Sequence, residues 1–118
     1  MSFNTIYADL ECPFCHQGIS SGVGFQVGVV ERRAYKHGDL INWKGSASRP
    51  KQRPKGGNIT TIGYFNCDNP SCSSWFDCYP EVQAALIVIK NDRIIEVSVY
   101  NGALSGEKFE ILEPSKSS

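Results

Sequence analysis

The strongest pattern of apolar and polar positions lies in the last third of the chain. Two runs rich in β-branched residues, 85–90 and 93–100, are separated by the polar pair Asn91-Asp92. A short polar pair between two such runs is typical of a β-hairpin. The first run is apolar on both faces, which predicts an interior strand. The second run alternates with a period of two, which predicts one buried face made of Ile95, Val97 and Val99.

Three more strands are predicted earlier in the chain. Alternation begins at Phe25 and continues towards Tyr35, where residues 36–39 carry a turn signal. Residues 40–43 are the predicted return strand. The stretch 60–66 is β-branched and aromatic, so we expect a strand that leads directly into Cys67.

No stretch shows a sustained helical period, and 81–86 is the only place where a single helical turn is expected. We therefore predict a mainly β fold, an antiparallel sheet with little helix. A chain of 118 residues fits one domain, which we place at 1–112. Residues 44–58 and 113–118 cannot bury enough apolar surface to offset their ordering entropy, so a flexible basic loop and a disordered tail are expected.

Composition narrows the classes of function. Lys plus Arg and Asp plus Glu both number 12, so the formal net charge is zero and gives no general attraction to nucleic acid or anionic membrane. No run approaches the roughly 20 apolar residues of a membrane helix, and the first ten residues lack signal-peptide features. We expect a cytoplasmic protein, in which closely spaced cysteines bind metal or do redox chemistry rather than form structural disulfides.

Four of the five cysteines form two short pairs. Cys12 and Cys15 enclose Pro13-Phe14, and Cys67 is separated from Cys72 by four residues. Both spacings occur among zinc ligands, and four thiolates fill the coordination sphere of one structural Zn²⁺. The first pair, with His16, resembles the knuckle of the zinc-ribbon superfamily, in which two turns at the tips of strand pairs hold one metal. The resemblance implies that Cys12, Cys15, Cys67 and Cys72 are the ligands. It departs from the usual knuckle because glycine comes only at Gly18.

Other ligand sets stay open. Cys78 lies in an aromatic stretch, 75–79, that indicates a strand with a buried thiol, yet Cys78, His16 or His37 could replace one of the four ligands. Tetrahedral sulfur ligation suits zinc or an iron centre, and we prefer zinc. In the absence of metal these residues would be buried free cysteines.

The Cys-Pro-Phe-Cys motif also resembles the active-site dithiol of glutaredoxins and related thiol oxidoreductases. That resemblance implies a nucleophilic Cys12, activated at a helix N-terminus, and a resolving Cys15. The three glycines and two serines of 16–24 are poor material for this helix. With two histidines, no glycine-rich phosphate loop and no Ser/His/Asp spacing, we expect a protein that is not an enzyme.

Two kinds of partner are expected. The first is a nucleic acid. The basic side chains of the flexible loop could bind its phosphates, while Trp43, Tyr64 or Phe65 stack on its bases. The resemblance to zinc ribbons, many of which serve nucleic-acid machinery, implies such a partner. The cations are Lys44, Arg49, Lys51, Arg53 and Lys55. The plainer interpretation of this loop is a solvated connection.

A protein partner is the favoured alternative. The stretch 77–113 carries more acids than bases, and its two-faced apolar strand 85–89 needs cover, which another chain could provide at a sheet edge. A small single-domain cytosolic protein that has no active site and binds another protein resembles, for example, the toxin-neutralising immunity proteins.

Overall fold

The computed structural model describes residues 3–44, 48–50, 53–67, 69, 83–100 and 111–113, with the backbone alone for Ser48, Arg49 and Glu113. These residues form short strands and one 3₁₀ turn. The strands are β1 (Asn4–Tyr7), β2 (Val23–Phe25), β3 (Gly28–Val29), β4 (Ala34–Lys36), β5 (Ser48–Arg49), β6 (Ile59–Phe65), β7 (Gln83–Lys90), β8 (Arg93–Val99) and β9 (Ile111–Glu113); the turn is η1 (Lys55–Gly57).

The main sheet has the order β4-β1-β2-β6-β7-β8, and β9 pairs with β6 beside this path. A mainly β fold with little helix is therefore confirmed for the described residues. The expected turn of helix at 81–86 is wrong where it can be judged, because β7 begins at Gln83. β3 and β5 form a separate two-stranded sheet.

The sheet, predicted to be antiparallel, is mixed, because β1 and β4 run in parallel, with Ile6 opposite Tyr35. The buried side chain of Asn4 supplies the physical reason. Its Nδ2 donates to the Val29 carbonyl at 2.9 Å, and its Oδ1 accepts from the backbone N–H of Glu31 at 3.1 Å and of Arg33 at 3.0 Å. These bonds fasten residues 29–33 to the start of β1, so the chain enters β4 in the direction of β1.

The region from Phe25 to Tyr35 is three short strands rather than one alternating strand. The chain bends at Gly28, whose φ is +79°, and a Cβ there would lie 2.6 Å from the Ile41 Cγ2. Residues 40–43 do not form the expected return strand; Leu40 makes an isolated antiparallel bridge to Arg93.

The β7–β8 hairpin is confirmed, with Asn91 and Asp92 at φ +51° and +68° in its turn. The predicted buried face of β8 is wrong at one position. The pairing shifts between Val88 and Ile89, so Ile95 is the extra residue of a β-bulge. Ile94 is therefore buried at 0% exposure, whereas Ile95 is 42% exposed.

The interior strands carry the core, and β7 is confirmed as one of them, between β6 and β8. Buried apolar side chains from β1, β2, β6, β7 and β8 form one cluster, which includes Ile6, Phe25, Ile59, Ile87 and Ile94. The sheet curls round this cluster into a half-barrel. Its ends meet where Gly38 N donates to the Ile94 carbonyl at 2.8 Å and Ile94 N donates to the Asp39 carbonyl at 3.1 Å.

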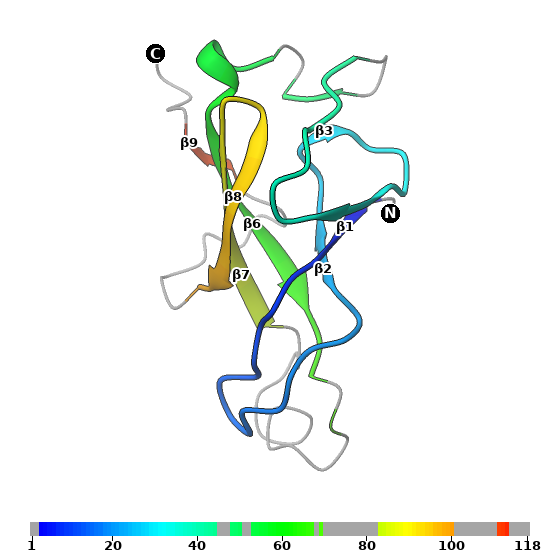
Figure 1. Ribbon diagram of the computed structural model, residues 1–118, viewed down its shortest axis with the longest axis vertical. Coiled ribbons are helices and arrows are strands. Elements are labelled where there is room, and N and C mark those ends of the chain that lie inside the picture. Colours follow the sequence, from blue (N-terminus) through cyan, green and yellow to red (C-terminus); the bar gives the residue numbers. More distant parts are fainter. Residues whose placement is uncertain are drawn as a thin grey trace.

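The strand predicted at 60–66 is confirmed as β6, which leads to Cys67. Figure 1 shows that the segment between β1 and β2 and the chain leaving β6 reach the same lower end of the molecule. The β7–β8 turn and η1 lie together at the upper end (Figure 1). The fold therefore brings two pairs of distant segments together, one at each end.

Candidate metal centre

Three cysteine sulfurs lie together at the lower end of the half-barrel. The Sγ atoms of Cys12, Cys15 and Cys67 all lie within 4.8 Å of one another, and those of Cys15 and Cys67 are 3.5 Å apart. Cys12 and Cys67 are buried and Cys15 is half-buried. The sequence predicted this convergence from the spacing of the two pairs, and the three residues could hold a metal ion.

The first pair lies in the turn of a narrow β-hairpin. Glu11 and Gly18 form an antiparallel bridge, and Cys12 N donates to the Gln17 carbonyl at 3.0 Å. The turn closes where His16 N donates to the Cys12 carbonyl at 2.9 Å. His16 has a φ of +64°, a left-handed conformation that glycine adopts with less strain. The usual knuckle has a glycine soon after its second cysteine, and here His16 adopts this backbone conformation instead.

Both cysteine turns offer backbone N–H groups to sulfur. Phe14 N lies 3.4 Å from the Cys12 Sγ, and Asn69 N lies 3.4 Å from the Cys67 Sγ. In each turn the donor comes two residues after the cysteine. Cysteine binds metal as a thiolate, and these N–H groups can donate hydrogen bonds to a metal-bound sulfur.

The sulfur positions fit metal ligation better than a disulfide. A disulfide needs sulfurs about 2.05 Å apart. Zn–S bonds of about 2.3 Å place tetrahedral sulfurs about 3.8 Å apart, close to the spacing of Cys15 and Cys67. Soft sulfur donors in this arrangement suit zinc or iron. Cys72 and Cys78, the two candidates for a fourth sulfur ligand, lie outside the described residues.

The two histidines predicted as alternative ligands, His16 and His37, are not part of the sulfur cluster. His37 follows β4, and its Nε2 donates to the Ile95 carbonyl at 2.9 Å. The ligand cluster found in the described part of the chain contains no histidine. His16 is exposed and directly follows Cys15, where its backbone closes the turn.

Of the five candidate nucleic-acid contacts, Lys44, Arg53 and Lys55 have side chains that the structure describes. Arg53 makes two hydrogen bonds to the Asp92 carboxylate, at 2.7 and 3.0 Å. Lys44 and Lys55 are exposed. The side chain of Arg49 and all of Lys51 lie outside the described residues.

The aromatic residues expected to stack on bases are also used by the fold. Trp43 Nε1 donates to the Asp92 carboxylate at 2.7 Å. Phe65 is only 2% exposed and lies in the core cluster, so it cannot receive a base in this structure. Tyr64, the next residue along β6, is half-buried.

Sequence analysis missed the role of Asp92. Its carboxylate joins the hairpin turn to Trp43 and Arg53, and its backbone N–H donates to the Gly57 carbonyl at 3.0 Å. The hydrogen bond from Arg53, and then that from Trp43, lowers the pKa of Asp92 below its usual range. An acidic residue in a hairpin turn, in a chain whose long loop is rich in cations, was the available signal.

No helix in the described part of the chain has the length and apolar character needed to cross a membrane. Comparison of the chain with protein-family models, with curated proteins and with solved structures gave no match.

Proposed function

We propose that this chain is a zinc-stabilised, non-catalytic binding protein whose partner is another protein. The observation that carries the proposal is the convergence of Cys12, Cys15 and Cys67 from two segments far apart in the sequence. We assign Cys72 as the fourth ligand, because a five-residue step back to the metal is well within the reach of the chain. Four thiolates leave the ion no position for a water molecule or a substrate, which favours a structural role.

The position of the first cysteine pair weighs against thiol oxidoreduction. An activated Cys-x-x-Cys dithiol usually lies at a helix N-terminus, which lowers the thiol pKa. Here Cys12 and Cys15 lie in a hairpin turn, and residues 3–44 contain no helix. A metal-binding dithiol is the better interpretation of the motif.

Exposed apolar side chains favour a protein partner. Among the described residues, the large apolar side chains that are more than two fifths exposed are Phe3, Tyr7, Phe14, Leu40 and Ile95. Arg53 and Trp43, two of the residues that a nucleic-acid interface would use, already share the Asp92 carboxylate. Nucleic-acid binding through Lys44 and Lys55 is the weaker alternative.

The ligand assignment is tested with two serine variants. Cys72→Ser should lower the bound zinc well below one ion per chain and destabilise the fold, whereas Cys78→Ser should keep one ion. The reverse result would move the fourth ligand to Cys78.

The binding role is tested by affinity capture from the native cell. The zinc-loaded chain should retain one stoichiometric protein after nuclease treatment. Retention that requires nucleic acid, or turnover of a disulfide substrate by the chain, would contradict the proposal.

A further inference from the structure

The half-barrel has an opening between β8 and the continuation of β1, the two segments that would have to pair to close it. β1, β2, β6, β7 and β8 are antiparallel in turn, so β1 and β8 run the same way. The turn that follows β4 touches Ile94 and Ile95 and closes the sheet there. Beyond that turn a cavity of about 630 Å³ lies between residues 7–9 and Val97 of β8. We call this opening the seam.

Both sides of the seam present backbone hydrogen-bonding groups. Tyr100 N donates to the Ala84 carbonyl at 2.9 Å, so the N–H and C=O groups of alternate residues, Val97 among them, point away from β7. On the other side, Thr5 N bonds the Arg33 carbonyl at 2.9 Å and Ile19 N bonds the Leu10 carbonyl at 2.9 Å. Backbone groups of successive residues point to alternate sides of a strand, so the N–H and C=O groups of Asp9 point towards the seam. No described strand pairs with Asp9, or with Val97 at the outer edge of β8.

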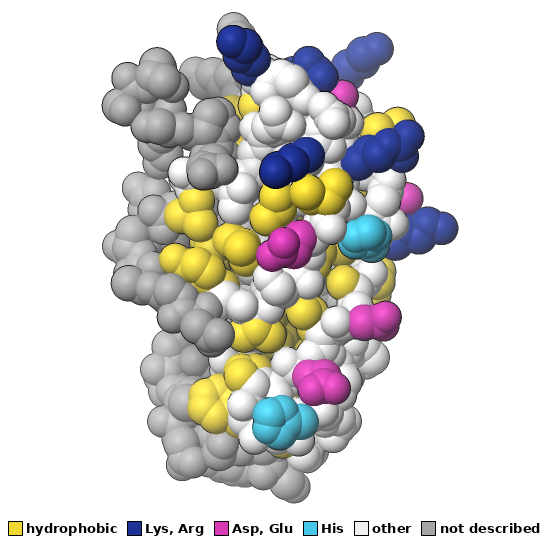
Figure 2. Space-filling model, turned by 60° about the vertical axis from the view of Figure 1, so that its left-hand side comes forward, with side chains coloured by type: hydrophobic (Ala, Val, Ile, Leu, Met, Phe, Trp, Pro, Cys, Tyr) yellow, Lys and Arg dark blue, Asp and Glu magenta, His cyan; other side chains and the backbone are white. Residues whose placement is uncertain are grey.

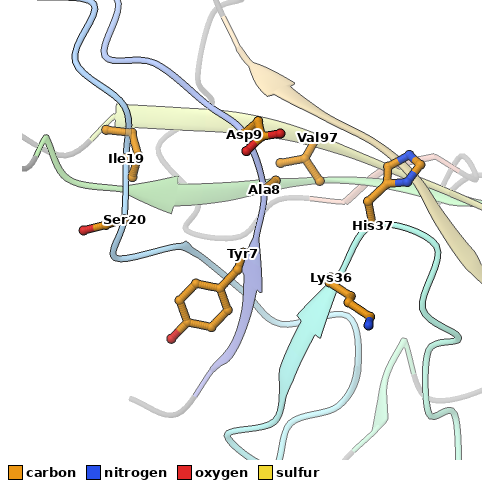
Figure 3. Close-up of a pocket in the computed structure, with 8 residues that line it drawn as sticks. All are labelled: Tyr7, Ala8, Asp9, Ile19, Ser20, Lys36, His37 and Val97. Atoms are coloured by element: carbon orange, nitrogen blue, oxygen red, sulfur yellow. The ribbon is translucent and has the colours of Figure 1, made fainter.

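The lining of the seam is apolar inside and charged at its ends. Ala8, Ile19 and Val97 are partly buried against the core cluster. Lys36 and His37 lie at the closed end, and Asp9 lies two residues beyond Tyr7, which is paired with Lys36. Figure 3 shows these side chains coming from β1 and its continuation, from the segment that leads into β2, from the end of β4 and from β8. Figure 2 shows one face of the molecule, on which exposed hydrophobic side chains lie among charged groups of both signs.

The volume of the seam suits an extended peptide. A strand takes up about 3.3 Å per residue along its axis, about 4.8 Å between neighbours and about 10 Å through the sheet. The cavity therefore corresponds to about four residues of strand. A strand that ran antiparallel to β8 would also be antiparallel to β1, so one inserted peptide could pair with both sides.

We propose that the seam binds an extended segment of the protein partner by β-strand addition, with a basic side chain at the N-terminal end of the segment and an acidic one at its C-terminal end. The proposal rests on the proposed function and names the surface through which it acts. The antiparallel direction places the C-terminal end beside Lys36 and His37 and the N-terminal end beside Asp9. Alternate apolar side chains of the segment then face Ala8, Ile19 and Val97.

The probe is acetyl-Lys-Val-Thr-Val-Glu-amide, and its control is acetyl-Glu-Val-Thr-Val-Lys-amide, which has the same composition and the opposite charge order. Titration of the zinc-loaded protein, followed by backbone amide NMR, should shift the amides of Asp9 and Val97. The probe should bind about fivefold more tightly than the control, the effect of two exposed ion pairs. In the double variant Asp9→Lys with Lys36→Glu, which changes two exposed side chains, this preference should be inverted.

Equal affinity for the two peptides, an unchanged preference in the double variant, or no shift at Asp9 and Val97 would overturn the assignment. Slow amide exchange at both residues in the free protein would also overturn it, because another segment or a second copy would already be paired there. Zinc content and affinity capture are measured separately, so failure of the peptide to bind leaves the proposed function standing.

Discussion

At the scale of single residues, side chains in unusual backbone conformations shape both ends of the molecule. His16 at φ +64° closes the first cysteine turn, and Asp92 at φ +68° lies in the β7–β8 turn. Histidine pays a steric cost there that glycine does not. Asp and Asn tolerate this conformation better because their short side chains can hydrogen-bond locally.

Replacing His16 by glycine should stabilise the protein. Relief of the left-handed strain outweighs the greater chain entropy of glycine, so we expect a gain of about 0.5–1 kcal/mol in the free energy of unfolding. Urea denaturation of the zinc-loaded protein measures the change. Gln17→Gly is the matched control, since Gln17 is also exposed and has no positive φ; it should be neutral or destabilising. A loss of stability in His16→Gly would contradict the strain argument.

The Arg53–Asp92 contact should couple the loop to the hairpin. In a double-mutant cycle of Arg53→Gln and Asp92→Asn, we expect a small but measurable favourable coupling energy, because the contact has two hydrogen bonds but is partly exposed to solvent. Asparagine tolerates the positive φ of residue 92 as aspartate does, so the cycle measures the effect of the carboxylate charge alone. A coupling near zero would mean that the loop is not anchored there.

The same contact defines a pH dependence. The folded pKa of Asp92 is lowered, first by the hydrogen bond from Arg53. Its contribution to stability is therefore fully present above the unfolded pKa of about 3.9 and is lost as the pH falls through the lower folded pKa. The stability difference between the wild type and Asp92→Asn should thus stay constant from about pH 6 to 8.

At the scale of elements, the β-bulge in β8 shows where the alternation of apolar and polar residues no longer predicts which side chains are buried. The sequence supports either of two registers, since Ile94 and Ile95 are both apolar and adjacent. Which one is buried depends on the pairing shift opposite Val88 and Ile89, a property of the hairpin as a whole. The parallel pairing of β4 was unpredictable for a similar reason, because it depends on the side-chain bonds of Asn4 to residues 29–33.

Alanine substitutions of Ile94 and Ile95 should show which of the two isoleucines is buried, and therefore which pairing register β8 adopts. Ile94→Ala removes a fully buried side chain and should cost about 2–4 kcal/mol of unfolding free energy. Ile95→Ala, its neighbour and control, should cost about 0.5 kcal/mol or less, because that side chain is 42% exposed. Similar losses in denaturation experiments would mean that the bulge is misplaced.

β6 depends on a close approach at Gly63. A Cβ at this position would lie 2.6 Å from the Val23 Cγ1 and 2.7 Å from the Gly24 carbonyl oxygen. Gly63→Ala should therefore destabilise the protein by about 1–3 kcal/mol, since backbone must move. Gly18→Ala is the control, because nothing lies within 4 Å of its Cβ position and the change should be nearly neutral. Equal stability of the two variants in thermal denaturation would contradict this packing.

At the scale of the whole molecule, the two ends of the half-barrel are closed by different chemistry. The sulfur cluster joins the β1–β2 segment to the end of β6, and Asp92 joins the long loop to the hairpin turn. The first could be predicted, because cysteine spacing restricts the partners to a few. The second had a weaker signal, an acidic residue in a hairpin turn of a chain with a cation-rich loop, because one acidic residue among the 12 has no spacing that identifies its partners.

The central claim is a zinc ion held by four sulfur ligands, and X-ray absorption at the zinc edge, calibrated by elemental analysis, tests it most directly. The account predicts one zinc per chain and a single shell of four sulfur atoms at about 2.3 Å. A folded sample without metal would contradict it. So would a shell containing an oxygen atom from water, since an open position is the mark of a catalytic site.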